Sequence, residues 1–88
     1  MLREKYIQLI QPFVEGALSV SEFETAYLKE FKAETEIMDT NLFKILDHLF
    51  ACVDSYWREC EEGLESQFEI SEAQLRREAK IALQKLQD

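Results

Sequence analysis

The sequence predicts an all-α protein, an antiparallel up-and-down four-helix bundle, from three features of its 88 residues. Apolar residues recur at steps of three and four along almost the whole chain, which is the helical period, and the alternation typical of strands is absent. Only two glycines and one proline interrupt this pattern, so few positions are suited to breaking a helix. Short connections then make successive helices antiparallel neighbours.

Local signals mark where three of the four helices begin or end. Gly16 suits the left-handed conformation that often ends a helix, and it should end the first one. Ser19 with Glu22, and Ser71 with Gln74, have the spacing of a capping box, which predicts the starts of the second and fourth helices. The apolar stripes of these helices are Leu2, Tyr6, Leu9, Ile10 and Phe13; Val20, Phe23, Tyr27 and Phe31; and Leu75, Ala79, Ala82, Leu83 and Leu86.

The third predicted helix is the longest and runs from about Thr40 to Glu62, with Gly63 as its stop signal. Its apolar residues fall within one wide arc, as expected of a helix that packs on several neighbours. They are Leu42, Leu46, Leu49, Phe50, Val53, Tyr56, Trp57 and Cys60.

The length of the chain predicts a single helical domain over residues 1–88. A chain of this size hides only about 60–65% of the surface that its unfolded form exposes. That is enough for one core but too little for a core and a deep catalytic cleft. We therefore expect a binding protein and no enzyme.

The net charge restricts the partners that such a protein can bind. Eighteen acidic residues against ten basic ones give a formal charge of −8. Nucleic acid and anionic membranes repel a surface of this sign, so direct binding to either is not expected. The expected partner is a basic protein.

The compartment is predicted to be the cytoplasm. No apolar run at the start of the chain is long enough for a signal peptide, and no stretch approaches the length of a membrane span. The only cysteines, Cys52 and Cys60, would lie about 12 Å apart on one helix, which is beyond disulfide reach. Two reduced thiols fit the cytosol.

The acidic excess is concentrated in the middle of the chain and suggests a binding face. Asp47, Asp54 and Glu61 recur every seven residues, so they would share one face of the third helix. Glu62 and Glu65 would extend it, and Glu59, Glu61 and Glu62 would oppose the macrodipole at the predicted helix end. Such a placement suggests a binding role, and the alternative is a solvated surface that keeps the protein soluble. Tyr56 and Trp57, beside this end, are candidate interface anchors or core residues.

Catalytic, metal and cofactor motifs are absent from the sequence. The residue three positions before His48 is Ile45, so the Glu-x-x-His motif of di-iron bundles is missing. No Cys-x-x-Cys pair or glycine-rich phosphate loop occurs. His48 and Cys52 are four residues apart, but no third group is evident that would complete a nucleophilic site. We expect no catalytic residue, metal or cofactor, and His48 should lie on the surface.

Two other binding functions fit the composition. Acyl carrier proteins are also small acidic four-helix bundles, and Asp54-Ser55 offers the dipeptide that carries their phosphopantetheine. However, Ser55 falls inside a long predicted helix, whereas the carrier serine stands at a helix start. The second alternative is a helical adaptor subunit of an unrelated complex.

Four pieces of sequence, in this order and spacing, resemble the colicin D type immunity proteins, a bacterial self-protection family also found beside contact-dependent inhibition toxins. The resemblance covers nearly the whole chain and begins with the opening amphipathic helix. It continues with Ser19-Val-Ser-Glu22-Phe23-Glu24 leading to Tyr27 and Phe31-Lys32, with Leu49-Phe50 followed by Val53-Asp54 and Tyr56, and with Ile70-Ser71-Glu72 leading to Leu75-Arg76.

The resemblance implies a four-helix bundle that binds the cytotoxic C-terminal domain of a cognate toxin and blocks its active site. That domain is typically a ribonuclease that cuts tRNA, and the acidic immunity surface takes the place of the nucleic-acid backbone. This role would fall on Asp47 and Asp54, and more loosely on Glu59, Glu61, Glu62 and Glu65. A monomer in a 1:1 complex is expected. The segment 57–68 departs from the family pattern.

Overall fold

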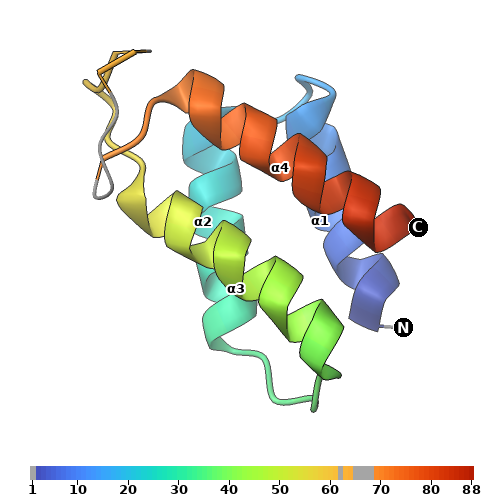
Figure 1. Ribbon diagram of the computed structural model, residues 1–88. Helices are drawn as coiled ribbons and strands as arrows, with labels where there is room; N and C mark the ends of the chain where they lie inside the picture. The colour runs from blue at the N-terminus through green and yellow to red at the C-terminus, as the bar shows by residue number, and fades with distance from the viewer. Residues whose placement is uncertain (1, 62, 65–68) are drawn as a thin grey trace.

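The computed structural model describes residues 2–61, 63–64 and 69–88, and these residues form four helices (Figure 1). They are α1 (Leu2–Val14), α2 (Val20–Lys32), α3 (Thr40–Ser55) and α4 (Glu72–Gln87). Each helix packs on the next in sequence, and α4 packs back on α1, which closes a ring of four. The predicted all-α four-helix bundle is confirmed.

Contacts between the helix ends show that the neighbours are antiparallel. The Arg3 guanidinium at the start of α1 donates to the carbonyl of Leu86 at the end of α4, with an N···O distance of 3.0 Å. Lys5 of α1 contacts Glu34, just beyond the end of α2. The two chain termini therefore lie on the same side of the bundle (Figure 1).

The core lies inside the ring and combines aromatic and aliphatic side chains. Phe13 and Phe23 stack with their ring centroids 4.2 Å apart, joining α1 to α2. The buried Tyr27 hydroxyl on α2 donates to the carbonyl of Leu46 on α3, with an O···O distance of 2.7 Å. The Tyr27 ring contributes buried apolar area, and its hydroxyl keeps a hydrogen-bond partner. The contact therefore stabilises the core without leaving a buried polar group unpaired. The predicted stripe of α4 is buried in full.

The predicted helix starts are confirmed by their hydrogen bonds. The Ser19 hydroxyl accepts from the Glu22 amide, and the Glu22 carboxylate accepts from the Ser19 amide, so the capping box of α2 is complete. The Ser71 hydroxyl accepts from the Gln74 amide at 3.1 Å and caps α4. Gly16 has a φ of 85°, the left-handed conformation expected after α1.

The predicted end of the third helix is wrong: α3 ends at Ser55 and does not reach residue 62. Tyr56 takes an extended conformation, and a short parallel bridge joins it to Ile70. The Ser55 carbonyl accepts from the Ile70 amide at 3.0 Å, and the Trp57 amide donates to the Ile70 carbonyl at 3.1 Å. These backbone groups pair with Ile70, two residues before α4, instead of continuing the helix. Gly63, at a φ of 93°, is in a turn beyond α3.

The shorter helix changes which side chains are buried. Trp57, predicted to lie in the apolar arc, is 54% exposed. Ile45, left out of that arc, is buried, whereas Tyr56 is only partly buried against the core. Among the described residues, every helix is too short or too polar to cross a bilayer.

Candidate functional site

Asp47 and Asp54 are exposed side chains on one face of α3, as predicted. Seven residues separate them, which is about 10 Å along a helix axis and close to two full turns. The two carboxylates therefore form a short row on the outside of the bundle, which we call the α3 acidic row.

The α3 acidic row lies on the side of α3 that borders α2. Burial is the main cause that raises the pKa of the Tyr27 hydroxyl, and the nearby Tyr6 and the charge of Asp47 raise it further. Phe31 of α2 contacts Phe43 and Phe50 of α3. Asp47 is four residues after Phe43 and three before Phe50, and Asp54 is four after Phe50, so both carboxylates lie on this side of α3. A ligand that reaches Asp47 would therefore also approach the outer surface of α2.

Asp54 occupies an electrostatically unfavourable position. It lies in the last turn of α3, where no basic residue compensates the partial negative charge of the free carbonyl groups. Helix stability alone would favour a cation there. The predicted helix placed Glu59, Glu61 and Glu62 at its end, where they would oppose its macrodipole. Because α3 ends at Ser55, before these residues, the acidic residue that opposes the macrodipole is Asp54.

Glu61 does not continue the α3 acidic row. Residues seven apart share a face only within one helix. Because α3 ends at Ser55, the spacing of seven from Asp54 does not place Glu61 on the same face. Glu59 and Glu61 are exposed in the segment that follows the bridge at Tyr56. Glu62 and Glu65 lie outside the described residues.

Tyr56 and Trp57 line a shallow hollow between the start of α2 and the segment after α3. The hollow has a volume of about 320 Å³, and its lining includes Glu24 and Arg58. Burial, followed by the charges of Glu72 and Glu24, raises the pKa of Tyr56. A half-exposed indole beside a carboxylate is suited to a protein contact with both apolar and cationic parts. The sequence did not single out Glu24, although it lies in the acid-rich segment 19–38.

Ser55 does not have the setting of a carrier serine. It is the last residue of α3, whereas a phosphopantetheine serine stands at the start of a helix. Its carbonyl accepts from Ile70, which fixes the backbone in the bridge that ends the helix. The carrier interpretation of Asp54-Ser55 therefore loses its structural support.

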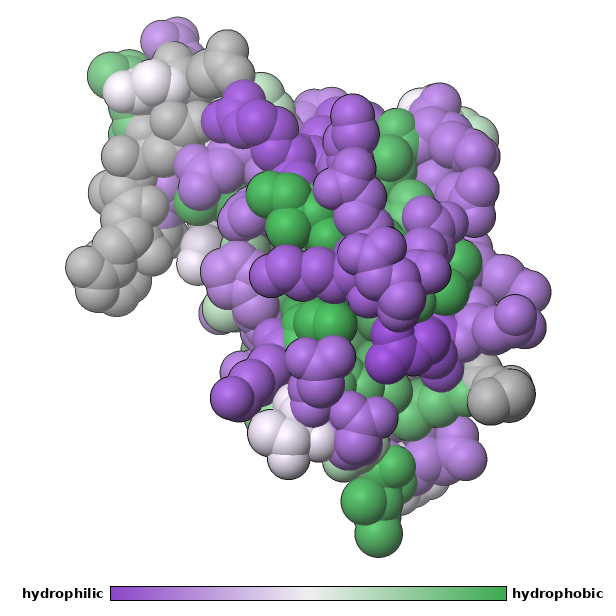
Figure 2. Space-filling model, turned by 45° about the vertical axis from the view of Figure 1, so that its right-hand side comes forward, coloured by the Kyte–Doolittle hydropathy of each residue, from purple (hydrophilic) through white to green (hydrophobic). Residues whose placement is uncertain are grey.

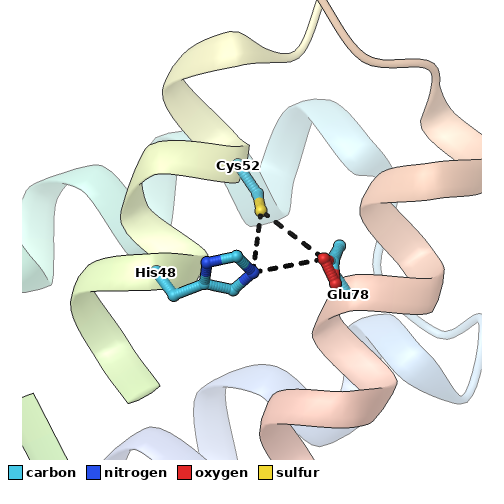
Figure 3. A group of neighbouring side chains, drawn as sticks. All are labelled: His48, Cys52 and Glu78. Atoms are coloured by element: carbon cyan, nitrogen blue, oxygen red, sulfur yellow. Dashed lines mark hydrogen bonds and ion pairs between the residues drawn. The ribbon is translucent and has the colours of Figure 1, made fainter. Parts of the chain in front are cut away.

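A second group of functional side chains joins α3 to α4 (Figure 3). His48, which is exposed as predicted, places its Nε2 atom 3.2 Å from Oε2 of Glu78, and Cys52 Sγ lies 3.8 Å from the same nitrogen. A third group thus stands beside the His48–Cys52 pair, contrary to the sequence interpretation. Glu78 comes from another helix, so sequence spacing could not identify it. The sequence could show only the pair on α3, through the His-x-x-x-Cys spacing of His48 and Cys52.

The surroundings of Cys52 do not favour a nucleophile. Burial, and secondarily the Glu78 charge, raises the pKa of the Cys52 thiol to about 11. A raised pKa disfavours the free thiolate that a nucleophile requires, whereas reactive cysteines have a lowered pKa.

The face of the molecule drawn in Figure 2 is mostly polar. Figure 2 shows hydrophilic side chains over most of the visible face, with hydrophobic ones in separate patches between them. A charged partner therefore fits this surface better than a broad apolar one.

A family model described as bacterial self-protective colicin-like immunity matches residues 1–86. The chain belongs to this family. It is an immunity protein, an inhibitor of a cognate toxin and not an enzyme. The predicted membership of the colicin-like immunity proteins and the predicted lack of catalytic activity are therefore confirmed, and the adaptor alternative is set aside. No curated protein and no solved structure matches the immunity protein.

Proposed function

We propose that this immunity protein neutralises a basic nuclease toxin, of the kind that cleaves tRNA, by covering its active site with the α3 acidic row. The observation that carries the proposal is the exposed pair Asp47 and Asp54, the second of which is placed against the helix macrodipole. A charge kept where it costs stability indicates selection for binding.

The chemistry of the target supports the proposal. An enzyme that cuts tRNA must hold phosphate groups with arginine and lysine side chains. Carboxylates can satisfy the same cations with charge-assisted hydrogen bonds. The net charge of −8 also favours rapid encounter with a cationic active site, up to about 10⁸–10⁹ M⁻¹s⁻¹ at low salt.

The hollow at Tyr56 and Trp57 extends the proposed contact beyond the acidic row. Trp57 supplies an exposed aromatic anchor, and Glu24, Glu59 and Glu61 supply further acidic groups on the neighbouring surface. Aromatic residues often dominate the binding energy of an interface, whereas charges at its rim mostly set the association rate. Glu62 and Glu65 remain candidates on the sequence argument alone.

The proposal includes a compartment and a stoichiometry. A tRNA-cleaving toxin acts in the cytoplasm, so its inhibitor should act there, as one copy bound to one toxin domain. The immunity protein should bind neither nucleic acid nor membrane directly, because its net charge repels both.

The test is inhibition of a nuclease by the purified immunity protein. The probe is the cytotoxic domain encoded beside the immunity gene, with a toxin domain of the same class from another system as the control. We expect a 1:1 complex, complete loss of tRNA cleavage at equal concentrations, and no protection against the control toxin. A cognate domain that forms pores or cuts no RNA would overturn the nuclease assignment while leaving the family role intact.

A further inference from the structure

The cluster of His48, Cys52 and Glu78 has the composition of a metal site. It presents one nitrogen, one sulfur and one carboxylate oxygen, and these ligand atoms all lie within 4.8 Å of one another. His48 and Cys52 are one helical turn apart on α3, and Glu78 faces them from α4 (Figure 3). The toxin contact proposed above at the α3 acidic row does not include these three residues.

The spacing of the three atoms fits the bond lengths of zinc. The distances are 3.2 Å from His48 Nε2 to Glu78 Oε2, 3.8 Å from Cys52 Sγ to His48 Nε2 and 4.0 Å from Cys52 Sγ to Glu78 Oε2. The circle through a triangle with these sides has a radius of about 2.1 Å, and zinc bonds to nitrogen, oxygen and sulfur span about 2.0–2.3 Å. An ion near the centre of the triangle would reach all three ligands with shifts of a few tenths of an ångström.

We propose that His48, Cys52 and Glu78 bind one divalent transition-metal ion of the zinc class between α3 and α4. A thiolate, an imidazole and a carboxylate together favour zinc, cobalt or nickel over magnesium and calcium, which prefer oxygen ligands alone. Three protein ligands leave the fourth tetrahedral position open to water.

The surroundings allow an ion to enter from solvent. The His48 side chain is 66% exposed and that of Glu78 is 20% exposed. Both line a groove of about 450 Å³ between α3 and α4. Lys44 and Lys85 also line this groove and oppose a cation there, whereas Glu78, Asp88 and the Cys52 thiolate would offset the charge of the ion.

Metal binding would tie the two helices together. The bridge between Tyr56 and Ile70 joins the residue after α3 to the segment before α4, and an ion would add a link between the helices themselves. An ion that binds the folded protein and not the unfolded one raises the melting temperature, and the rise grows with the logarithm of the ion concentration relative to its Kd. The metal should therefore stabilise the packing of α3 against α4.

The test is titration of the metal-free protein with Co²⁺ under reducing conditions, followed by displacement with Zn²⁺. We expect one ion per chain, a thiolate-to-cobalt charge-transfer band and a rise in melting temperature with Zn²⁺. Cys52→Ser should abolish the charge-transfer band, and His48→Gln or Glu78→Gln should weaken binding at least ~10-fold, since even changes behind the ligands cost that much. Cys60→Ser, which removes the other thiol, should leave all readouts unchanged.

The alternative is that His48 and Glu78 form a plain ion pair and Cys52 packs as a small apolar residue. In that case Co²⁺ gives no charge-transfer band and Zn²⁺ leaves the melting temperature unchanged, which overturns the proposal. A band that survives Cys52→Ser but is lost in Cys60→Ser would overturn it equally. Far-ultraviolet circular dichroism of each variant shows whether the helices remain formed.

Discussion

The Glu34 carboxylate accepts a hydrogen bond from the Lys5 ammonium, with an N···O distance of 2.6 Å, and ties the first helix to the segment after the second. The same oxygen accepts from the Tyr6 hydroxyl at 3.0 Å. Although charged, the Glu34 side chain is only 7% exposed. The bond from Lys5 is the main cause that lowers the pKa of Glu34, against the opposing effect of desolvation.

This lowered pKa predicts a pH dependence of stability. A carboxyl group with a lower pKa in the folded state contributes stability that is present above its unfolded pKa, here about 4.5, and lost as the pH falls through the folded value. Glu34→Gln should therefore lower the free energy of unfolding at pH 7, and the gap to wild type should narrow below pH 4.5. Urea titrations between pH 7 and 3 measure it. Glu36→Gln, which removes an exposed carboxylate two residues further on, is the matched control, and a gap independent of pH would contradict the assignment.

The cap of α4 predicts a cost for removing one hydroxyl. Ser71 is 3% exposed and its hydroxyl accepts from the Gln74 amide. Ser71→Ala should lower the free energy of unfolding by about 1 kcal/mol, because a helix-terminal amide loses its acceptor. Ser21→Ala, at an exposed position in α2, should change stability by no more than about 0.5 kcal/mol. Coincident thermal melts of wild type and Ser71→Ala would reject this cap.

The position of Asp54 predicts a substitution that stabilises the fold. Replacing this carboxylate in the last turn of α3 by an ammonium group improves the interaction with the helix macrodipole. Asp54→Lys should raise the free energy of unfolding by about 0.3–1 kcal/mol at low salt, and high salt should screen the gain. Asp47→Lys, nearer the middle of the helix, should gain less. If Asp54→Lys is destabilising, the carboxylate is not placed against the macrodipole as we argue.

Most of the fold could be predicted because its signals are local. Ser19, Ser71 and Gly16 act within one turn of the helices that they begin or end, so their spacing was sufficient. The end of α3 depends on Ile70, whose backbone pairs with Ser55 and Trp57 from 13 or more residues away. Helical periodicity continues through this segment and carries no information about that pairing.

The candidate site was predicted only where it lies within one helix. Asp47 and Asp54 share a face because seven residues of α3 separate them, whereas Glu61 lost that register when the helix ended. The cluster at His48 and Cys52 needs Glu78 from α4, and the hollow at Trp57 needs Glu24 from α2. Contacts between residues of different helices depend on how the helices pack, which neither composition nor periodicity specifies.

The central claim is that the α3 acidic row binds the toxin, and the most direct measurement is the affinity of the cognate toxin domain for a double charge reversal, Asp47→Lys with Asp54→Lys. The control is Glu4→Lys with Glu15→Lys, which makes the same change in net charge at two exposed positions, one in α1 and one just after its end, outside the row. We expect the reversal on α3 to weaken binding by about 2–5 kcal/mol and to release tRNA cleavage. The control should alter chiefly the association rate and its salt dependence. If the α3 variant binds the toxin domain with the affinity of the wild type and inhibits it fully, this result contradicts the account, and the α3 acidic row is only a solvent-exposed surface.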